Sequence, residues 1–183
     1  MSRRPKPQLT HVALFTRDLD RMVDFYSKVM GLTVTDEGSA LSAPSRMVFM
    51  SADPGEHHQF VLLGGRADGA ADNVAQQISF LVESLDELRA MRDLVSLAGL
   101  HINRTVTHGN AWSFYFDDPE GNQIEIYTHT PWYVPQPHAY PFDLSLTNEE
   151  IIARTEAHVR DDPQFMPADE REKVMTKLMA QAD

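Results

Sequence analysis

The sequence contains no cysteine, which excludes a disulfide framework and thiolate chemistry. It also has no apolar run long enough to span a bilayer, and its basic first residues lead into no apolar run of signal-peptide length. Positive charge is scarce: the sequence has 16 Lys and Arg but 27 Asp and Glu, which gives a net charge of -11. Nucleic acid and anionic membranes would therefore be repelled. We expect a soluble, cytoplasmic protein with neither as a partner.

What is present is typical of a globular chain. Of the 183 residues, 42% are hydrophobic and 23% are charged, so the chain can bury a sizeable core in one domain built from small modules. We predict a paired domain over residues 1–130, with module one at 8–65 and module two at 76–128. Residues 131–183 form a C-terminal extension.

Module one begins with a β-type run that contains His11. Asp18 can cap a helix from Leu19 to about Met30, and Gly31 can end it. Three further strands are predicted at Leu32–Val34, Arg46–Met50 and His57–Leu63. A polar linker of small residues follows at 66–73.

Module two repeats this pattern. A strand at Gln77–Val82 is followed by Ser84-Leu85-Asp86-Glu87, a capping box that opens a helix to about Ala98. Gly99 closes the helix, and strands are predicted near His101–Val106, Trp112–Phe116 and Gln123–Tyr127. DLDRM at Asp18 and SLDEL at Ser84 superpose with a shift of 66 residues. We predict a tandem βαβββ repeat.

The repeat relates polar residues of the two modules. His11 corresponds to Gln77 on the first strands, and the strand carrying His57-His58-Gln59 corresponds to the strand carrying Glu125. Glu125 lies mid-strand between two isoleucines, where a carboxylate is costly to bury unless it is paired or binds a cation. It could instead face water from an edge strand. We favour a shared centre to which both modules contribute.

The C-terminal extension has a different character. Thr130–Pro137 is rich in proline and aromatic residues and predicts an extended arm. Thr147-Asn148-Glu149-Glu150 is a second capping box, opening a helix to about Val159, and Asp169–Gln181 predicts a last amphipathic helix. We expect the arm and helices to pack on the paired domain or on a partner subunit of a homo-oligomer, a dimer or larger.

Residues 9–127 resemble the vicinal oxygen chelate superfamily, which includes glyoxalase I, fosfomycin-resistance enzymes, antibiotic-binding proteins and type I extradiol dioxygenases. Val106-Thr107-His108, five residues, Phe114-Tyr115, Asp118-Pro119-Glu120-Gly121 and then Glu125 fit the extradiol signature with its spacing kept. The short chain with its Pro-Trp-Tyr tail is similar to one-domain members of the biphenyl-diol type. The resemblance implies an α+β fold in which tandem βαβββ modules form a cupped mixed sheet around a metal site.

The resemblance also implies a ligand set. The family holds Fe(II), occasionally Mn(II), with two His and one Glu, leaving room for a catecholate and O₂. The ligand positions fall on His11, Gln77 and Glu125, so an amide replaces the second imidazole, as superfamily glyoxalases also allow. Alternatively, His58 is itself a ligand, or His11 is an ordinary core histidine.

Three further residues carry implied catalytic roles. The HHQFVL segment resembles the strand with the family's acid/base histidine, which selects His58, because neighbouring His57 would point to the opposite face of a strand. His108 and Tyr115 would hydrogen-bond the substrate oxygens or dioxygen, or else be a turn histidine and a core tyrosine. The remaining aromatic residues could line a pocket or simply be core, namely Trp112, Phe114, Trp132 and Tyr133.

The favoured function is an Fe(II)-dependent extradiol dioxygenase that opens the ring of a catechol-type aromatic diol with O₂. One alternative is a glyoxalase-type metal-dependent isomerase or lyase, which Gln77 favours. Another is a metal-free protein that binds an aromatic compound.

Overall fold

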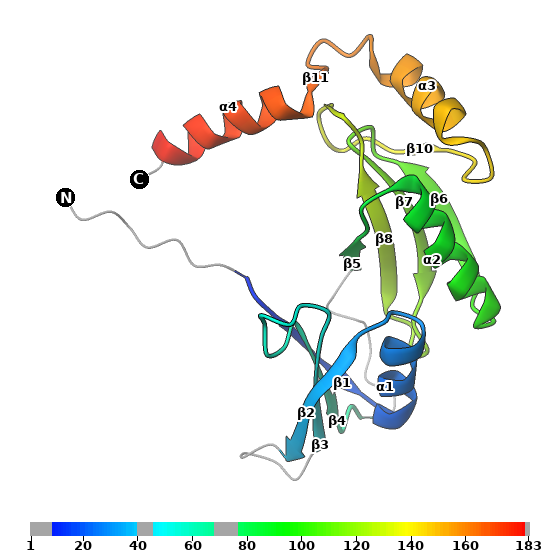
Figure 1. Ribbon diagram of the computed structural model, residues 1–183, viewed down its shortest axis with the longest axis vertical. Helices are drawn as coiled ribbons and strands as arrows, with labels where there is room; N and C mark the ends of the chain where they lie inside the picture. Colours follow the sequence, from blue (N-terminus) through cyan, green and yellow to red (C-terminus); the bar gives the residue numbers. More distant parts are fainter. Residues whose placement is uncertain (1–8, 40–45, 68–76, 182–183) are drawn as a thin grey trace. The chain divides into compact units, whose positions relative to one another are not determined.

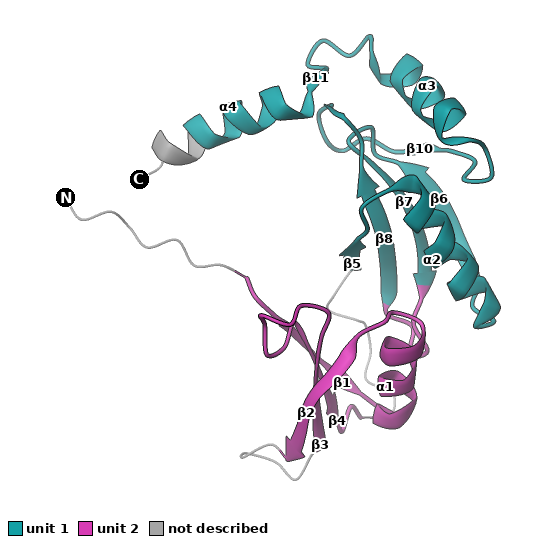
Figure 2. Cartoon of the chain, in the orientation of Figure 1, with its two compact units in different colours: residues 1–5, 77–116, 123–183 teal, residues 6–76, 117–122 magenta. Residues whose placement is uncertain are grey.

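The computed structural model describes residues 9–39, 46–67 and 77–181 (Figure 1). Most of the predicted linker, residues 68–73, lies outside this described part, as does Gln76. The chain forms two compact units (Figure 2). The N-terminal unit contains Lys6–Gln76 together with Asp117–Asn122, and the C-terminal unit contains Gln77–Phe116 and Gln123–Asp183.

The N-terminal unit is a four-stranded sheet with one helix. Its strands lie in the order β1-β4-β3-β2, with β1 parallel to β4 and the other pairs antiparallel. The Asp18 side chain caps α1 by accepting the backbone N–H of Arg21, as predicted. The buried face of α1 includes Tyr26, whose ring centroid lies 4.4 Å from that of Phe60. The elements are β1 Val12–Thr16, α1 Leu19–Lys28, β2 Thr33–Ser39, β3 Arg46–Ser51 and β4 Phe60–Gly64.

The C-terminal unit repeats this arrangement and extends it. Its sheet has the order β10-β6-β7-β8-β5, and without β10 this matches the first sheet strand for strand. The α2 helix begins after Ser84, which accepts the N–H of Glu87, and lies against the sheet (Figure 1). The tandem βαβββ prediction is confirmed. The repeated elements are β5 Ile78–Leu81, α2 Leu85–Leu97, β6 Ile102–Thr107, β7 Ala111–Asp117 and β8 Gln123–His129.

One detail of the repeat was predicted wrongly. The last strand of module one begins at Phe60, so His57 and His58 precede it and are not on it. The strand pairing then shows which residues correspond: Val12 pairs with Phe60, and its repeat partner Ile78 pairs with Ile124. The counterpart of Glu125 is therefore Val61, a buried core residue, and not one of the histidines.

The C-terminal arm is tied to the second sheet. It contributes β10, Tyr140–Pro141, which the sequence did not predict. This strand pairs with β6. The Thr147 capping box is present with both of its hydrogen bonds and opens α3, Asn148–Val159. The buried Trp112 indole N–H donates to the Thr155 hydroxyl over 2.9 Å, which fixes α3 to β7. Further along are β9 Trp132–Tyr133, β11 Met166–Pro167 and α4 Ala168–Gln181.

Within the described residues, no helix combines the length and the apolar character needed to cross a bilayer.

The turn between β7 and β8 is organised by one buried carboxylate. Asp118 Oδ1 accepts the backbone N–H groups of Glu120 and Asn122, and Oδ2 accepts the Asn122 amide and the Tyr26 hydroxyl. Glu120 in turn accepts the backbone N–H groups of Arg17 and Asp18 at the start of α1. The predicted turn therefore also holds the helix of the N-terminal unit.

Replacing Asp118 with Ala should cost about 2–4 kcal/mol of unfolding free energy, because several buried donors lose a charged acceptor together. Tyr26→Phe removes one of these hydrogen bonds and should cost about 1 kcal/mol. Asp117→Ala, a change at the exposed neighbouring residue, is the matched control and should stay within about 0.5 kcal/mol. Urea unfolding measures all three; equal stability of the Asp118 and Asp117 variants would contradict this account.

Candidate active site

One face of the second sheet is polar. Side chains alternate along β7 and β8, so Phe114, Phe116, Ile124 and Ile126 form the fully buried apolar face. Tyr115 and Glu125 belong to the opposite face, together with Ser79, the register partner of Glu125 on β5. Glu125 is only 7% exposed, so its carboxylate is not the water-facing group of an edge strand.

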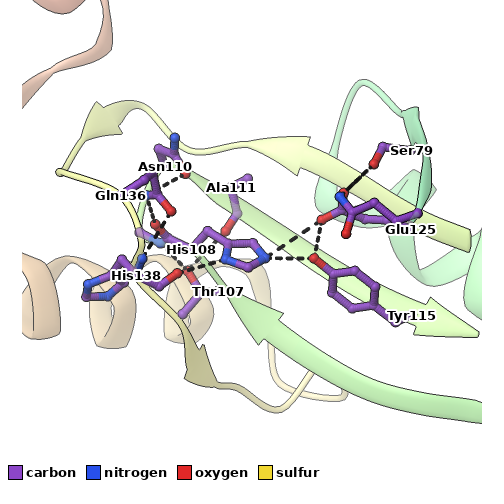
Figure 3. Close-up of polar contacts among 11 residues, drawn as sticks. Ser79, Thr107, His108, Asn110, Ala111, Tyr115, Glu125, Gln136 and His138 are labelled. Carbon is purple, nitrogen blue, oxygen red and sulfur yellow. Dashed lines mark hydrogen bonds and ion pairs between the residues drawn. The ribbon is translucent and has the colours of Figure 1, made fainter. Parts of the chain in front are cut away.

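The Glu125 carboxylate accepts hydrogen bonds from three side chains, of which Ser79 and Tyr115 are labelled in Figure 3. Its Oε2 accepts the Ser79 hydroxyl at 2.6 Å and the Gln77 amide N–H at 2.9 Å. Its Oε1 accepts the Tyr115 hydroxyl at 2.5 Å. Gln77 and Glu125, both predicted site residues, are therefore in contact, and Ser79 joins them although the sequence did not single it out.

The hydrogen-bond chain continues to His108. Its Nε2 lies 2.8 Å from the Tyr115 hydroxyl and its Nδ1 lies 2.8 Å from the carbonyl oxygen of His138. A carbonyl can only accept, so Nδ1 carries a proton. Nε2 also lies 3.8 Å from Glu125 Oε1, so the imidazole, the phenol and the carboxylate are within reach of one another.

Tyr115 is kept as a neutral phenol. Burial raises its pKa well above the ordinary value, and the hydrogen bond to Glu125 acts in the same direction. The Arg104 guanidinium, 4.0 Å from the ring centroid, partly opposes this shift. Tyr115 thus remains a hydrogen-bond donor to Glu125 and links this carboxylate to His108.

His108 is positioned by the C-terminal arm. The Gln136 side chain donates to the His108 carbonyl oxygen at 2.7 Å, and the His138 carbonyl receives Nδ1–H (Figure 3). Gly109 follows with φ of 75°, and a Cβ there would overlap the Val134 side chain. A backbone carbonyl acceptor leaves no trace in the residue types, so the sequence could not identify the role of the arm.

The predicted site residues of module one lie in the N-terminal unit. His11 immediately precedes β1, just as Gln77 precedes β5, and its ring centroid lies 4.5 Å from that of His58. The prediction that His57 and His58 point to opposite faces is wrong, because their Nδ1 atoms are 2.9 Å apart on a turn. Partial burial, and then the neighbouring His11 and His57, lower the pKa of His58. The unprotonated imidazole, the form that can act as a base, is thereby favoured.

The aromatic residues of the signature are mostly core. Trp112 and Phe114 are buried on β7, on the apolar face opposite Tyr115. Trp132 packs its ring against Trp112 and Phe165, and Tyr133 lies under the Arg171 guanidinium. The core interpretation therefore holds for Trp112, Phe114 and Trp132.

The residues around Glu125 fit a divalent cation. A buried carboxylate beside a carboxamide, whose Oε1 can serve as a neutral oxygen donor, is suited to a hard cation. Within the described residues, no three His, Cys, Asp or Glu side chains gather as a ready-made metal site. Ligation by His11, Gln77 and Glu125 together stays a prediction, because His11 belongs to the other unit.

A family model described as Glyoxalase/Bleomycin resistance protein/Dioxygenase superfamily matches residues 8–126. The chain belongs to this superfamily. Among curated proteins, it is 27% identical over 168 residues to biphenyl-2,3-diol 1,2-dioxygenase 2 of Rhodococcus globerulus, covering 81% of this chain and 84% of that protein. It is 25% identical over 130 residues to the metapyrocatechase of Geobacillus stearothermophilus, covering 71% of this chain but only 37% of that longer protein.

Two solved structures share the fold. A glyoxylase/bleomycin resistance protein/dioxygenase domain from Frankia sp. EAN1pec matches with a TM-score of 0.59 and 20% identity, covering 69% of this chain and 100% of that chain. The fosfomycin resistance protein FosX of Listeria monocytogenes, complexed with Mn(II), matches with a TM-score of 0.55 and 17% identity, covering 69% and 95%. At these identities the likeness concerns the fold alone.

Gly109→Ala should displace the arm from His108. Gly99 has a similar left-handed φ of 77°, but no atom lies within 4 Å of the position that an added Cβ would take, so Gly99→Ala isolates the backbone strain. We expect Gly99→Ala to cost about 1–2 kcal/mol of unfolding free energy, and Gly109→Ala to cost at least about 3 kcal/mol because overlap with Val134 adds to the strain. Urea unfolding compares them; equal losses would show that the contact with Val134 does not matter.

Proposed function

We propose that this superfamily member is an Fe(II)-dependent extradiol dioxygenase that cleaves the ring of a catechol-type aromatic diol with O₂. The observation that carries the proposal is the hydrogen-bonded chain of His108, Tyr115 and Glu125. These three residues define the extradiol signature in the sequence, and they form one network in the structure. The named relatives act on biphenyl-2,3-diol or bear the name metapyrocatechase, which supports the same class.

The metal would be held by His11, Gln77 and Glu125. Fe(II), or Mn(II) in its place, supplies a Lewis-acid centre that brings the diol and O₂ together. Gln77 is the departure from the family's two-His-one-Glu set, and its amide oxygen is a weaker donor than imidazole. In the structure its amide N–H faces Glu125. Rotating the amide about its terminal bond would present the oxygen instead.

The chain's own residues would handle protons and charge. His58, with its lowered pKa, would accept a proton from a diol hydroxyl and later return it. The Tyr115 hydroxyl, and the His108 imidazole when Nε2 carries a proton, would stabilise negative charge developing on oxygen. The arm holds the His108 ring through Nδ1, so the ring presents Nε2 in a fixed direction.

Glyoxalase-type isomerase or lyase chemistry is the second candidate, and Gln77 is the observation that favours it. A glutamine at this position is shared with superfamily glyoxalases. The intact signature around Tyr115 weighs toward the dioxygenase. It also weighs against a metal-free binding protein, since a protein that only sequesters an aromatic compound would not need this network.

Oxygen uptake tests the proposed reaction. The purified protein, reconstituted with Fe(II) under anaerobic conditions, should consume one O₂ per catechol and form a yellow ring-opened product. Glu125→Ala should abolish both metal binding and oxygen uptake, because the buried carboxylate ligand is lost. Asp117→Ala, an exposed carboxylate in the same hairpin, is the matched control and should retain both.

Two results would contradict the proposal. Full metal occupancy in Glu125→Ala would rule out this metal centre. A metal-loaded protein that consumes no O₂ with catechol, 3-methylcatechol or biphenyl-2,3-diol would exclude the dioxygenase and leave the isomerase or lyase to be tested.

Gln77→His should hold Fe(II) more tightly than the native chain, because imidazole is a stronger donor to Fe(II) than a carboxamide oxygen. Iron titration of both apo-proteins measures the difference directly. Ser79→Ala, which removes a hydrogen bond to Glu125 without changing a predicted ligand, is the comparison variant. Indistinguishable affinities of Gln77→His and the native chain would mean that Gln77 is not a ligand.

A further inference from the structure

A cavity of about 440 Å³ lies in the C-terminal unit between the arm and α3. Its walls come from the arm segment around Tyr140–Asp143, from α3 and from Thr107 at the end of β6. None of its lining residues belongs to the Glu125 hydrogen-bond network. The volume lies in the lower part of the range of sites that hold small organic ligands.

The cavity walls are fixed by hydrogen bonds. The Thr105 hydroxyl donates to the Phe142 carbonyl oxygen at 2.6 Å, which ties the arm to β6. The Arg89 guanidinium on α2 donates to the carbonyl oxygens of Leu144 and Leu146, at 3.0 and 2.6 Å. On the other side the buried bond from Trp112 holds Thr155, a lining residue of α3. These bonds fix the arm and α3 on either side of the space.

The lining combines apolar surface with a cation that has no bonded partner. The exposed Arg154 side chain makes no hydrogen bond or ion pair within the described part of the chain. The lining carboxylate of Asp143 accepts two bonds from Ser145, which lower its pKa, and the positive charge of Arg154 acts on it in the same direction. The His158 and Tyr140 rings are stacked, with centroids 4.0 Å apart and planes 25° apart. Apolar side chains such as Phe142 and Ile151 complete the walls.

We propose that this cavity is a second ligand site, one that binds a small aromatic carboxylate. The Arg154 guanidinium pairs with the carboxylate through its two-pronged donor geometry, for which arginine is suited. The ring packs against the apolar wall and the stacked pair of His158 and Tyr140. A neutral aromatic compound fills the same space but forms no charged hydrogen-bonded pair with Arg154.

The site adjoins the segment that positions His108. Tyr140 pairs in register with Thr107, which directly precedes His108, and the His138 carbonyl two residues earlier receives the His108 Nδ1–H. A ligand in the cavity therefore contacts the same arm that holds the imidazole. The binding site itself does not depend on the proposed dioxygenase reaction.

Fluorescence titration with benzoate tests the site. The chain has two tryptophans, and in a Trp132→Phe background the remaining Trp112 bonds to Thr155 in the cavity wall and reports on it. We expect saturable binding of benzoate, with Kd at least about tenfold weaker in Arg154→Gln because a charged hydrogen-bonded pair is lost. Arg160→Gln, at the C-cap of α3 and outside the lining, should bind benzoate like the parent.

Two comparisons locate the anion. Benzyl alcohol, the neutral analogue, should bind to the parent at least about tenfold more weakly than benzoate does. Its Kd should be the same for the parent and for Arg154→Gln. Tyr115→Phe should retain benzoate binding, because Tyr115 is not among the residues that line the cavity. No saturable binding, equal Kd values for parent and Arg154→Gln, or loss of binding in Tyr115→Phe would each overturn the proposal.

Discussion

The burial of one carboxylate, that of Glu125, constrains the polar face of the second sheet. A buried carboxylate needs donors or a cation, and the two strands that flank β8, together with the residue before β5, supply side chains that meet this need. Tyr115 in turn needs His108, and His108 needs the carbonyl of the arm. Each group in the chain is thus oriented by the next, and the last link lies outside the βαβββ repeat.

Local signals explain how much of the fold could be predicted. Helix starts were identified because Asp18, Ser84 and Thr147 cap their helices through their own side chains. The start of β4 was placed too early, because the residue pattern around His57-His58-Gln59 resembles that of a strand. In the structure the Gln59 side chain accepts the backbone N–H of Ala52, so it closes the loop after β3 and the ladder begins one residue later. The two-residue strand β10 is too short to leave a pattern at all.

Some residues of the candidate site could likewise be predicted from local sequence, and others could not. His108, Tyr115 and Glu125 were predicted together because their spacing is fixed within one hairpin, and the structure joins them. Ser79 was missed although it alternates in phase with Gln77, because a serine in a strand carries no chemical signal by itself. The His138 contribution is a backbone carbonyl, which any residue possesses. Joint metal binding by His11 and Glu125 would bring together residues that are far apart in the sequence. This prediction still rests on the repeat and the family resemblance.

The turn Asp117–Asn122 has a consequence for how the duplicated chain can be divided. It is covalently part of the second module, yet its hydrogen bonds to Tyr26, Arg17 and Asp18 make it part of the N-terminal unit. The first copy expressed alone would lack the acceptors for these groups, including that of a buried phenol. The N-terminal unit is therefore complete only when the second module supplies this turn.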